Sequence, residues 1–162
     1  MVRHAIAFEQ DPARWPDDRL RPLTSQGEAR FRTVARALAR VTAGVDVVLA
    51  SAYVRAWRTA EILAAEAGWP DPIACQPLEA DRSPSEMIDV LRTHARRTAV
   101  AVVGHEPHLG ELISYLLTGG NEVAVVMKKG GVAQLSFDGI PAPGTAIFRW
   151  LAPPKLLRAA RR

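Results

Sequence analysis

Residues 98–120 read TAVAVVGHEPHLGELISYLLTGG, and this stretch decides the fold. Its first half is a continuously apolar run that ends at Gly104, as expected of a strand covered on both faces. Its second half has apolar residues at helical spacing and then a Gly-Gly stop; they are Leu109, Leu112, Ile113, Leu116 and Leu117. A buried strand that runs directly into a helix is the building unit of a parallel sheet.

The same alternation continues on both sides of this stretch. Strands are predicted at 2–8, 45–51, 72–77 and 98–105, and helices at 24–41, 53–67, 83–97 and 106–118. The helix at 83–97 has Ser83 as a cap, Pro84 at its first position and Glu86 where a capping box needs it. Two further strands, at 132–137 and 144–152, flank a Gly/Pro turn and predict a hairpin-like pair.

This order predicts an α/β fold with three α/β/α layers, a mostly parallel central sheet and an antiparallel strand at one edge. The chain of 162 residues suits one core, and it contains no repeat or low-complexity linker. We therefore expect a single domain over residues 1–162.

Charged side chains and imidazoles follow several of the predicted strands. Arg3 and His4 stand at the first strand, Arg55 begins the helix after the second, and His105 follows the fourth. Ligands of such sheets bind beyond the carboxyl ends of the strands, so these four residues should converge.

The converging set suits a phosphoryl group. A guanidinium offers a planar fork of donors for phosphate oxygens, and a helix N-terminus adds unpaired N–H groups. A neutral histidine can act as a nucleophile and form a covalent intermediate. We expect a second, protonated histidine to stabilise charge that develops on the transferred group.

Five segments then carry a family resemblance: VRHA at 2–5, RPLTSQG at 21–27, SAYVRAWRTAE at 51–61, VVGHEPHL at 102–109 and KKGGVAQLSF at 128–137. Together they resemble the histidine phosphatase superfamily, whose fold is phosphoglycerate mutase-like. The short chain is most similar to the small branch of SixA-type phosphohistidine phosphatases.

The resemblance implies roles for matching positions. His4 would be the nucleophile that is phosphorylated, and Arg3, Arg55 and His105 would complete the phosphate pocket. Arg21 would lie at the pocket rim and meet the substrate. Glu79 is a candidate proton donor, although neither it nor Asp81 falls in a motif that matches the family's acid.

The absence of a matched acid bears on the substrate. An alkoxide leaving group needs a proton, whereas imidazole, with a pKa of roughly 6.5, leaves far more readily. We therefore expect a phosphatase that acts on phosphohistidine in a protein or peptide. The alternatives are a broad-specificity phosphomonoesterase or mutase of the same superfamily, and a non-catalytic module that binds phosphate or nucleic acid.

Composition limits the other classes of function. The net charge is +4, and the chain has one cysteine, Cys75, which excludes an internal disulfide and fits a cytoplasmic setting. We expect no cofactor and no metal, because the HEPH sequence at 105–108 lacks the spacing of a metalloprotease HExxH motif. Partners are expected to be a phosphorylated protein or small molecule, with neither a membrane nor nucleic acid; the sequence leaves the oligomeric state open.

Overall fold

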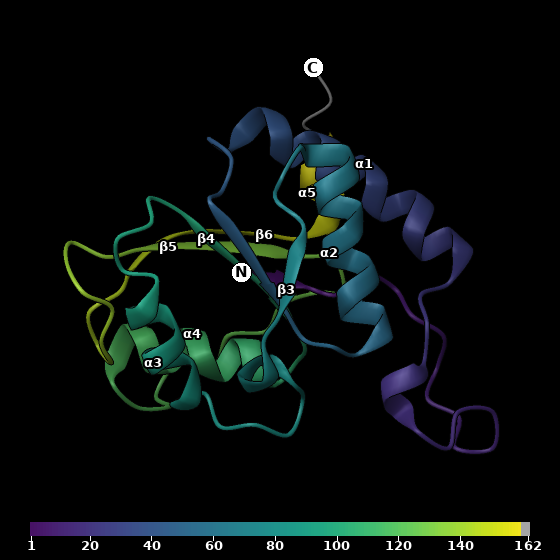
Figure 1. Ribbon diagram of the computed structural model, residues 1–162, viewed down its shortest axis with the longest axis horizontal. Helices are drawn as coiled ribbons and strands as arrows, with labels where there is room; N and C mark the ends of the chain where they lie inside the picture. The colour runs from purple at the N-terminus through teal and green to yellow at the C-terminus, as the bar shows by residue number, and fades with distance from the viewer. Residues whose placement is uncertain (160–162) are drawn as a thin grey trace.

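The computed structural model describes residues 1–159, which form a six-stranded sheet covered by helices (Figure 1). The order of strands across the sheet is β3-β2-β4-β1-β5-β6. Their bounds are β1 Val2–Arg3, β2 Val47–Ala50, β3 Pro72–Ala74, β4 Val100–Gly104, β5 Val132–Ser136 and β6 Ile147–Ala152.

The sheet is mostly parallel, as the sequence predicts. β1 to β4 run in one direction, whereas β5 is antiparallel to both β1 and β6. The antiparallel strand therefore lies second from the edge, and the edge strand β6 returns to the common direction.

Two groups of helices cover the two faces of the sheet (Figure 1). One group consists of α1 Ser25–Val41, α2 Val54–Ala67 and α5 Pro154–Ala159. The other consists of α3 Glu86–Thr93 and α4 His108–Thr118. This arrangement confirms the predicted three layers, while α5 was not predicted. None of the helices in residues 1–159 combines the length and apolar character needed to cross a bilayer.

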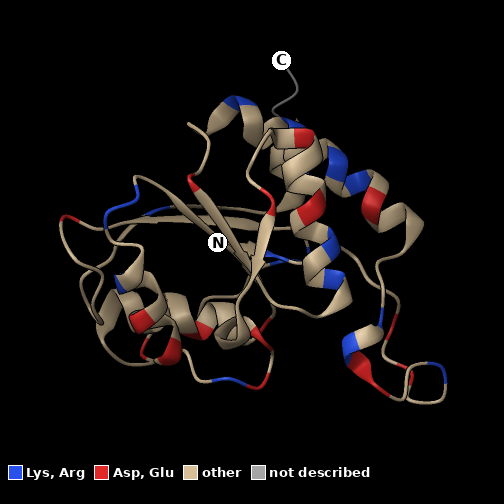
Figure 2. Ribbon diagram, viewed as in Figure 1, with Lys and Arg blue, Asp and Glu red and all other residues tan. Residues whose placement is uncertain are grey.

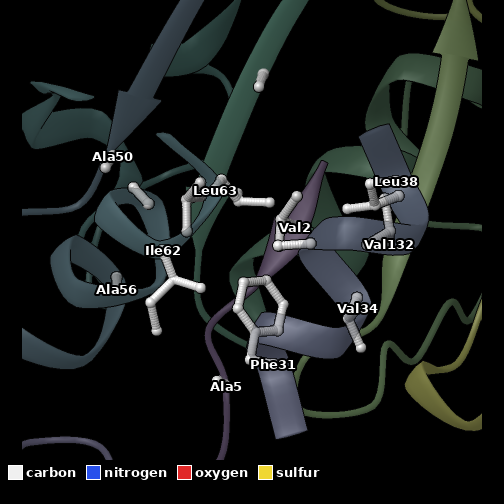
Figure 3. Packing of buried hydrophobic residues seen from close by; sticks show 14 of the residues in the cluster. Val2, Ala5, Phe31, Val34, Leu38, Ala50, Ala56, Ile62, Leu63 and Val132 are labelled. Atoms are coloured by element: carbon white, nitrogen blue, oxygen red, sulfur yellow. The ribbon is translucent and has the colours of Figure 1, made fainter. Parts of the chain in front are cut away.

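Alternate residues of the buried strands serve two separate cores, one on each face. Val48 and Ala50 of β2 pack with Phe31, Ile62 and the rest of the α1, α2 and α5 side (Figure 3). Val47 and Leu49 point the other way, into a cluster with α3 and α4. A strand buried on both faces must be apolar at every position, which explains the unbroken apolar runs in the sequence.

All the predicted elements are shorter in the structure, most of all the strand predicted at 2–8 and the helix predicted at 83–97, which ends at Thr93. The strand predicted at 2–8 ends at Arg3, because the N–H of Ala5 donates to Oγ1 of Thr59 instead of to a neighbouring strand. The helix predicted from Ser83 begins at Glu86. The Glu86 carboxylate nevertheless accepts the N–H of Ser83, at 3.2 Å, as in one half of a capping box.

One groove in the sheet lies away from the predicted site. It has a volume of about 660 Å³ and lies at the amino ends of β1 and β4, lined in part by Trp69, Trp150 and β5. The polar residues of interest lie at the opposite end, where β1, β2 and β4 finish. The fold thus separates this groove from the predicted site.

Candidate active site

Three neighbouring strands end side by side and deliver the polar residues that follow them. Arg3 of β1 pairs with Gly104 of β4, and Ala50 of β2 pairs with Val103 of β4. The next residue along each strand is therefore His4, Ser51 or His105, and all three fall at one edge. His4 is 5% exposed and His105 is 2% exposed, so the two imidazoles are buried there.

The two imidazole rings face each other, and their centroids are 5.2 Å apart. Nδ1 of His4 lies 2.7 Å from the carbonyl oxygen of Ala5. Because a carbonyl oxygen can only accept, Nδ1 carries the proton and Nε2 of a neutral ring keeps its lone pair. His4 is thus held in the tautomer that a nucleophile requires.

His105 is oriented by side chains from β2 and α2. Its Nε2 lies 2.9 Å from Oγ of Ser51, which is fully buried. The ring of Tyr53, the residue before α2, lies against the other side, with centroids 4.9 Å apart. These contacts fix the plane of the His105 ring.

Burial sets the protonation of the pair. Desolvation, followed by the charges of Arg55 and Arg3, lowers the pKa of His4 to about 3, against the hydrogen bond to Ala5. Desolvation and the neighbouring His4 lower the pKa of His105 to about 2. Both pKa values lie well below 7, so the neutral form of each ring is favoured in the protein alone, and a nearby anion would favour a proton on the pair. The role of a protonated second histidine in the transfer step stays a prediction.

Arg55 reaches the histidines from the first turn of α2. It is 3% exposed, and desolvation lowers the pKa of its guanidinium. Its two terminal nitrogens are engaged by Asp18: one donates to the backbone oxygen at 2.7 Å, and the other lies 2.9 Å from Oδ2. Nε of Arg55 is buried without a partner among residues 1–159.

Arg3 approaches from β1, and desolvation lowers its pKa as well. One terminal nitrogen donates to the backbone oxygen of Met127 at 2.6 Å. Its Nε is also buried and unpartnered within the described part of the chain. The charges of Arg3 and Arg55 both act on His4, so the structure brings together all four residues predicted to form the pocket.

Arg21 lies at the margin of this group. Its charge lowers the pKa of both histidines, which places it nearby. Its Nε is 2.6 Å from Oδ1 of Asp18, and another nitrogen donates to the backbone oxygen of Phe8 at 2.6 Å. Asp18 belongs to a short helix, η1 Asp18–Leu20, on a projecting loop where acidic and basic residues stand together (Figures 1 and 2). Arg21 therefore sits at the rim, as predicted, with its guanidinium held by Asp18.

Glu79 is farther from the two imidazoles. It caps the end of η2 Gln76–Leu78, beyond the carboxyl end of β3, and is half-buried. The hydrogen bonds of residues 1–159 include none from its side chain. Its charge acts on Tyr53, where Asp81 has a larger influence, and burial is the main cause that raises the pKa of that phenol. The described hydrogen bonds and ion pairs thus join Glu79 to neither His4 nor His105.

Ser51 follows the second predicted strand in the sequence, and in the structure it lies beside His105. Tyr53 and Asp18 were missed. Tyr53 lies between Ser51 and Arg55 in the SAYVRAWRTAE segment, which was an available signal. Nothing in the sequence indicated Asp18, because its contact with Arg55 depends on the path of the loop before α1. No group of three or more His, Cys, Asp or Glu side chains suited to a metal ion occurs among the described residues.

Comparisons with known proteins give a family match. The family model of the histidine phosphatase superfamily (branch 1) matches residues 1–79. An uncharacterized protein of Picosynechococcus sp. is 36% identical over 135 residues, which cover 82% of this chain and 81% of that protein.

Solved structures share the fold over nearly the whole chain. The protein histidine phosphatase SixA complexed with tungstate has a TM-score of 0.84 at 24% identity, covering 96% of both chains. The alpha-ribazole phosphatase of Shigella flexneri has a TM-score of 0.69 at 16% identity, covering 94% of this chain and 95% of that one. A phosphoserine phosphatase of Entamoeba histolytica in complex with phosphoserine has a TM-score of 0.66 at 14% identity, covering 95% of both chains.

Proposed function

Because the chain belongs to the histidine phosphatase superfamily, we propose that it is a metal-independent phosphatase that hydrolyses phosphohistidine in a protein or peptide. We propose that residues 1–162 form one catalytic domain and that the reaction passes through phospho-His4. The observation that carries the proposal is the tautomer of His4. Its Nδ1–H is tied to Ala5, and its free Nε2 belongs to a ring 5.2 Å from that of His105.

The first step transfers the phosphoryl group to the protein. The lone pair on Nε2 of His4 attacks phosphorus, and the bond from phosphorus to the substrate nitrogen breaks. The electron pair of that bond stays on the leaving imidazole. A ring whose other nitrogen is already protonated departs as neutral imidazole and needs no donor from the protein.

The second step releases phosphate. Because the Ala5 carbonyl keeps Nδ1 of His4 protonated, the phosphorylated ring is an imidazolium, from which phosphorus is readily lost. A water oxygen attacks phosphorus, the P–Nε2 bond breaks, and its electron pair returns to a neutral His4. One proton of the water stays on the phosphate and the other is released.

Arg3, Arg55 and His105 stabilise the transferred group in this scheme. The buried, unpartnered Nε atoms of the two arginines are donors available for phosphate oxygens. Their guanidiniums and the imidazole of His105 act in a desolvated site, where fixed charges are worth more than in water. Arg21, held at the rim, would meet the part of the substrate that carries the phosphate.

The position of the carboxylates supports a phosphoramidate substrate. Asp18 is engaged by two guanidiniums, and Arg21 lowers its pKa, so it is a poor proton donor. Glu79 forms no hydrogen bond to either imidazole in the described structure. A substrate whose leaving group needs no proton fits this arrangement better than a stable ester does.

Chemical trapping tests the proposal. Wild-type protein incubated with labelled acetyl phosphate should retain phosphate that is labile in acid and stable in alkali. A His4→Ala variant should retain none and lose turnover, whereas His94→Ala, at the end of α3, should behave as wild type. Normal turnover by His4→Ala would defeat the proposal.

A second candidate, a phosphomonoesterase or mutase, is favoured by one observation. Glu79 lies on the Tyr53 side of the site, where the leaving group of an ester could receive a proton. A panel that compares phosphohistidine peptide with stable alkyl phosphates separates the two candidates. Efficient ester turnover that is lost in Glu79→Gln would favour the second, and poor ester turnover favours phosphohistidine.

A further inference from the structure

A short strap of backbone, residues 127–131, crosses the end of β1 and holds both residues that follow Val2. The N–H of Gly130 donates to the carbonyl oxygen of His4 at 2.9 Å, and the N–H of Arg3 donates to Gly131 at 3.1 Å. The guanidinium of Arg3 is held as well, because it donates to the oxygen of Met127 at 2.6 Å. The direction of the Arg3 side chain therefore depends on where Met127 lies.

Glu106 fixes Met127 from the opposite side. Its Oε1 accepts the N–H of Met127 at 3.0 Å, so Glu106 holds the peptide group before the Met127 Cα, while Arg3 holds the one after it. The backbone N–H groups of Met127 and Gly110 both lower the pKa of the Glu106 carboxyl and so favour its charged form. Glu106 directly follows His105, so adjacent residues carry the imidazole and the carboxylate that holds the strap.

At Gly110, the backbone of α4 packs closely against Val125, just before the strap, and against the Glu106 carboxylate. A Cβ on Gly110 would lie 2.1 Å from the backbone oxygen of Val125 and 3.0 Å from Oε2 of Glu106. Only a glycine lets α4 approach so closely. The carboxylate of Glu106 is thus confined between α4 and residues 125–127, and it has little freedom to move without moving Met127.

Charge adds to the connection between Glu106 and Arg3. Burial raises the pKa of Glu106, and the positive charge of Arg3 opposes this rise. Glu106 in turn raises the pKa of Arg3 against a larger lowering by desolvation. The other charged group that acts on Glu106 is Glu111, one turn along α4. No ion pair within 4 Å joins Glu106 to Arg3 in residues 1–159, so the link runs through Met127.

We propose that Glu106 is a positioning residue, which holds the Arg3 guanidinium toward the phosphate site through the backbone of Met127. The expected effect of Glu106 on turnover rests on the proposed function. Its expected effect on anion binding does not. A purely structural role for Glu106 would affect stability and every activity alike. If Glu106 acts through Arg3, the effect of changing Glu106 must disappear once the Arg3 side chain has been removed.

The experiment is a double-mutant cycle with Glu106→Ala, which removes the acceptor for the Met127 N–H, and Arg3→Ala. Sulfate affinity and kcat and KM for acetyl phosphate are measured for the wild type, both single variants and the double variant. Glu106→Ala is expected to lower sulfate affinity and kcat/KM about tenfold, and less than twofold in the Arg3→Ala background. Glu111→Ala, which removes a nearby carboxylate in the first turn of α4, is the matched control and should change both values less than twofold.

A tenfold loss that persists in the Arg3→Ala background, or an equal loss in Glu111→Ala, would overturn the proposal. If Glu106→Ala does not fold, Glu106→Asp takes its place in the cycle, because it keeps the charge but is too short to reach Met127. If the wild type does not turn over acetyl phosphate, the proposed function fails, and the sulfate cycle still decides the role of Glu106.

Discussion

Sulfate binding to the candidate site is expected to take up about one proton at pH 7. In the protein alone the pKa of His4 is about 3 and that of His105 about 2, so the pair is neutral. An anion between two rings whose centroids are 5.2 Å apart would lie within about 4 Å of each. Sulfate is a dianion throughout this range, so any proton that is taken up must go to the protein.

The size of the effect follows from Coulomb's law. The interaction energy of two unit charges 4 Å apart is about 4 kcal/mol at an effective dielectric of 20. A dianion at that distance therefore stabilises an imidazolium by about 8 kcal/mol. That energy corresponds to about six pKa units, since one unit is about 1.4 kcal/mol. A pKa near 2 would therefore rise to about 8, above the pH of the experiment.

Calorimetric titration with sulfate in buffers of different ionisation enthalpy counts the protons. The wild type should take up about one proton per sulfate, and its affinity should fall about tenfold for each pH unit of rise near pH 7. The double variant His4→Asn/His105→Asn should take up none, because the two rings titrate as one coupled pair. His94→Asn should match the wild type. Uptake of no proton by the wild type would refute the reasoning about the buried pair.

Three further outcomes are expected. Because the two buried histidines have lower pKa values when folded than the ordinary 6.5, the unfolded chain binds more protons, and the free energy of unfolding should fall below pH 6.5 by up to about 1.4 kcal/mol per unit for each ring. Urea melts at pH 7.5 and pH 5 that coincide would contradict this. Gly27→Ala should cost roughly 2–3 kcal/mol in urea melts, because its Cβ would lie 2.1 Å from a backbone oxygen, whereas Gly139→Ala, which faces open space, should cost almost nothing. Asp18→Asn should tighten sulfate binding about fivefold by removing an anion that competes for Arg55, while Asp17→Asn should not; weaker binding would mean that Asp18 orients the guanidinium.

Much of the fold could be predicted because the sheet is buried on both faces. β2 and β4 must be apolar at every position, so each reads as an unbroken run. The helices between them show the spacing of an amphipathic face, and Gly68 and Gly119 end two of them with φ of 69° and 82°. Elements predicted from such patterns are present in the structure because the tertiary contacts favour the same strands and helices.

The meeting of His4, Arg55 and His105 was predictable for a topological reason. Parallel strands of one sheet end at the same edge, so residues that follow different strands become neighbours without any local sequence signal. The register confirms this, since Arg3 pairs with Gly104 directly before the two histidines.

Features that depend on loop paths could not be predicted. Asp18 reaches Arg55 across 37 residues, and Glu106 reaches Met127 across 21. The first contact depends on the path of the chain before α1, and the second on the path of the chain after α4. The protonation state of His105 could not be predicted from the sequence for another reason. Sequence shows that an imidazole is present, whereas its pKa depends on how completely the fold removes water from the ring.

The neutral histidine pair gives the site a built-in preference for charged ligands. A neutral molecule would bring no counter-charge to the desolvated Arg3 guanidinium, so it gains little from the charged groups of the site. Under the proposed function, a phosphoryl dianion would satisfy the arginine donors and also make protonation of an imidazole favourable. Its binding would then create the positive charge that stabilises the proposed transfer step, so the group to be transferred would activate the site that transfers it.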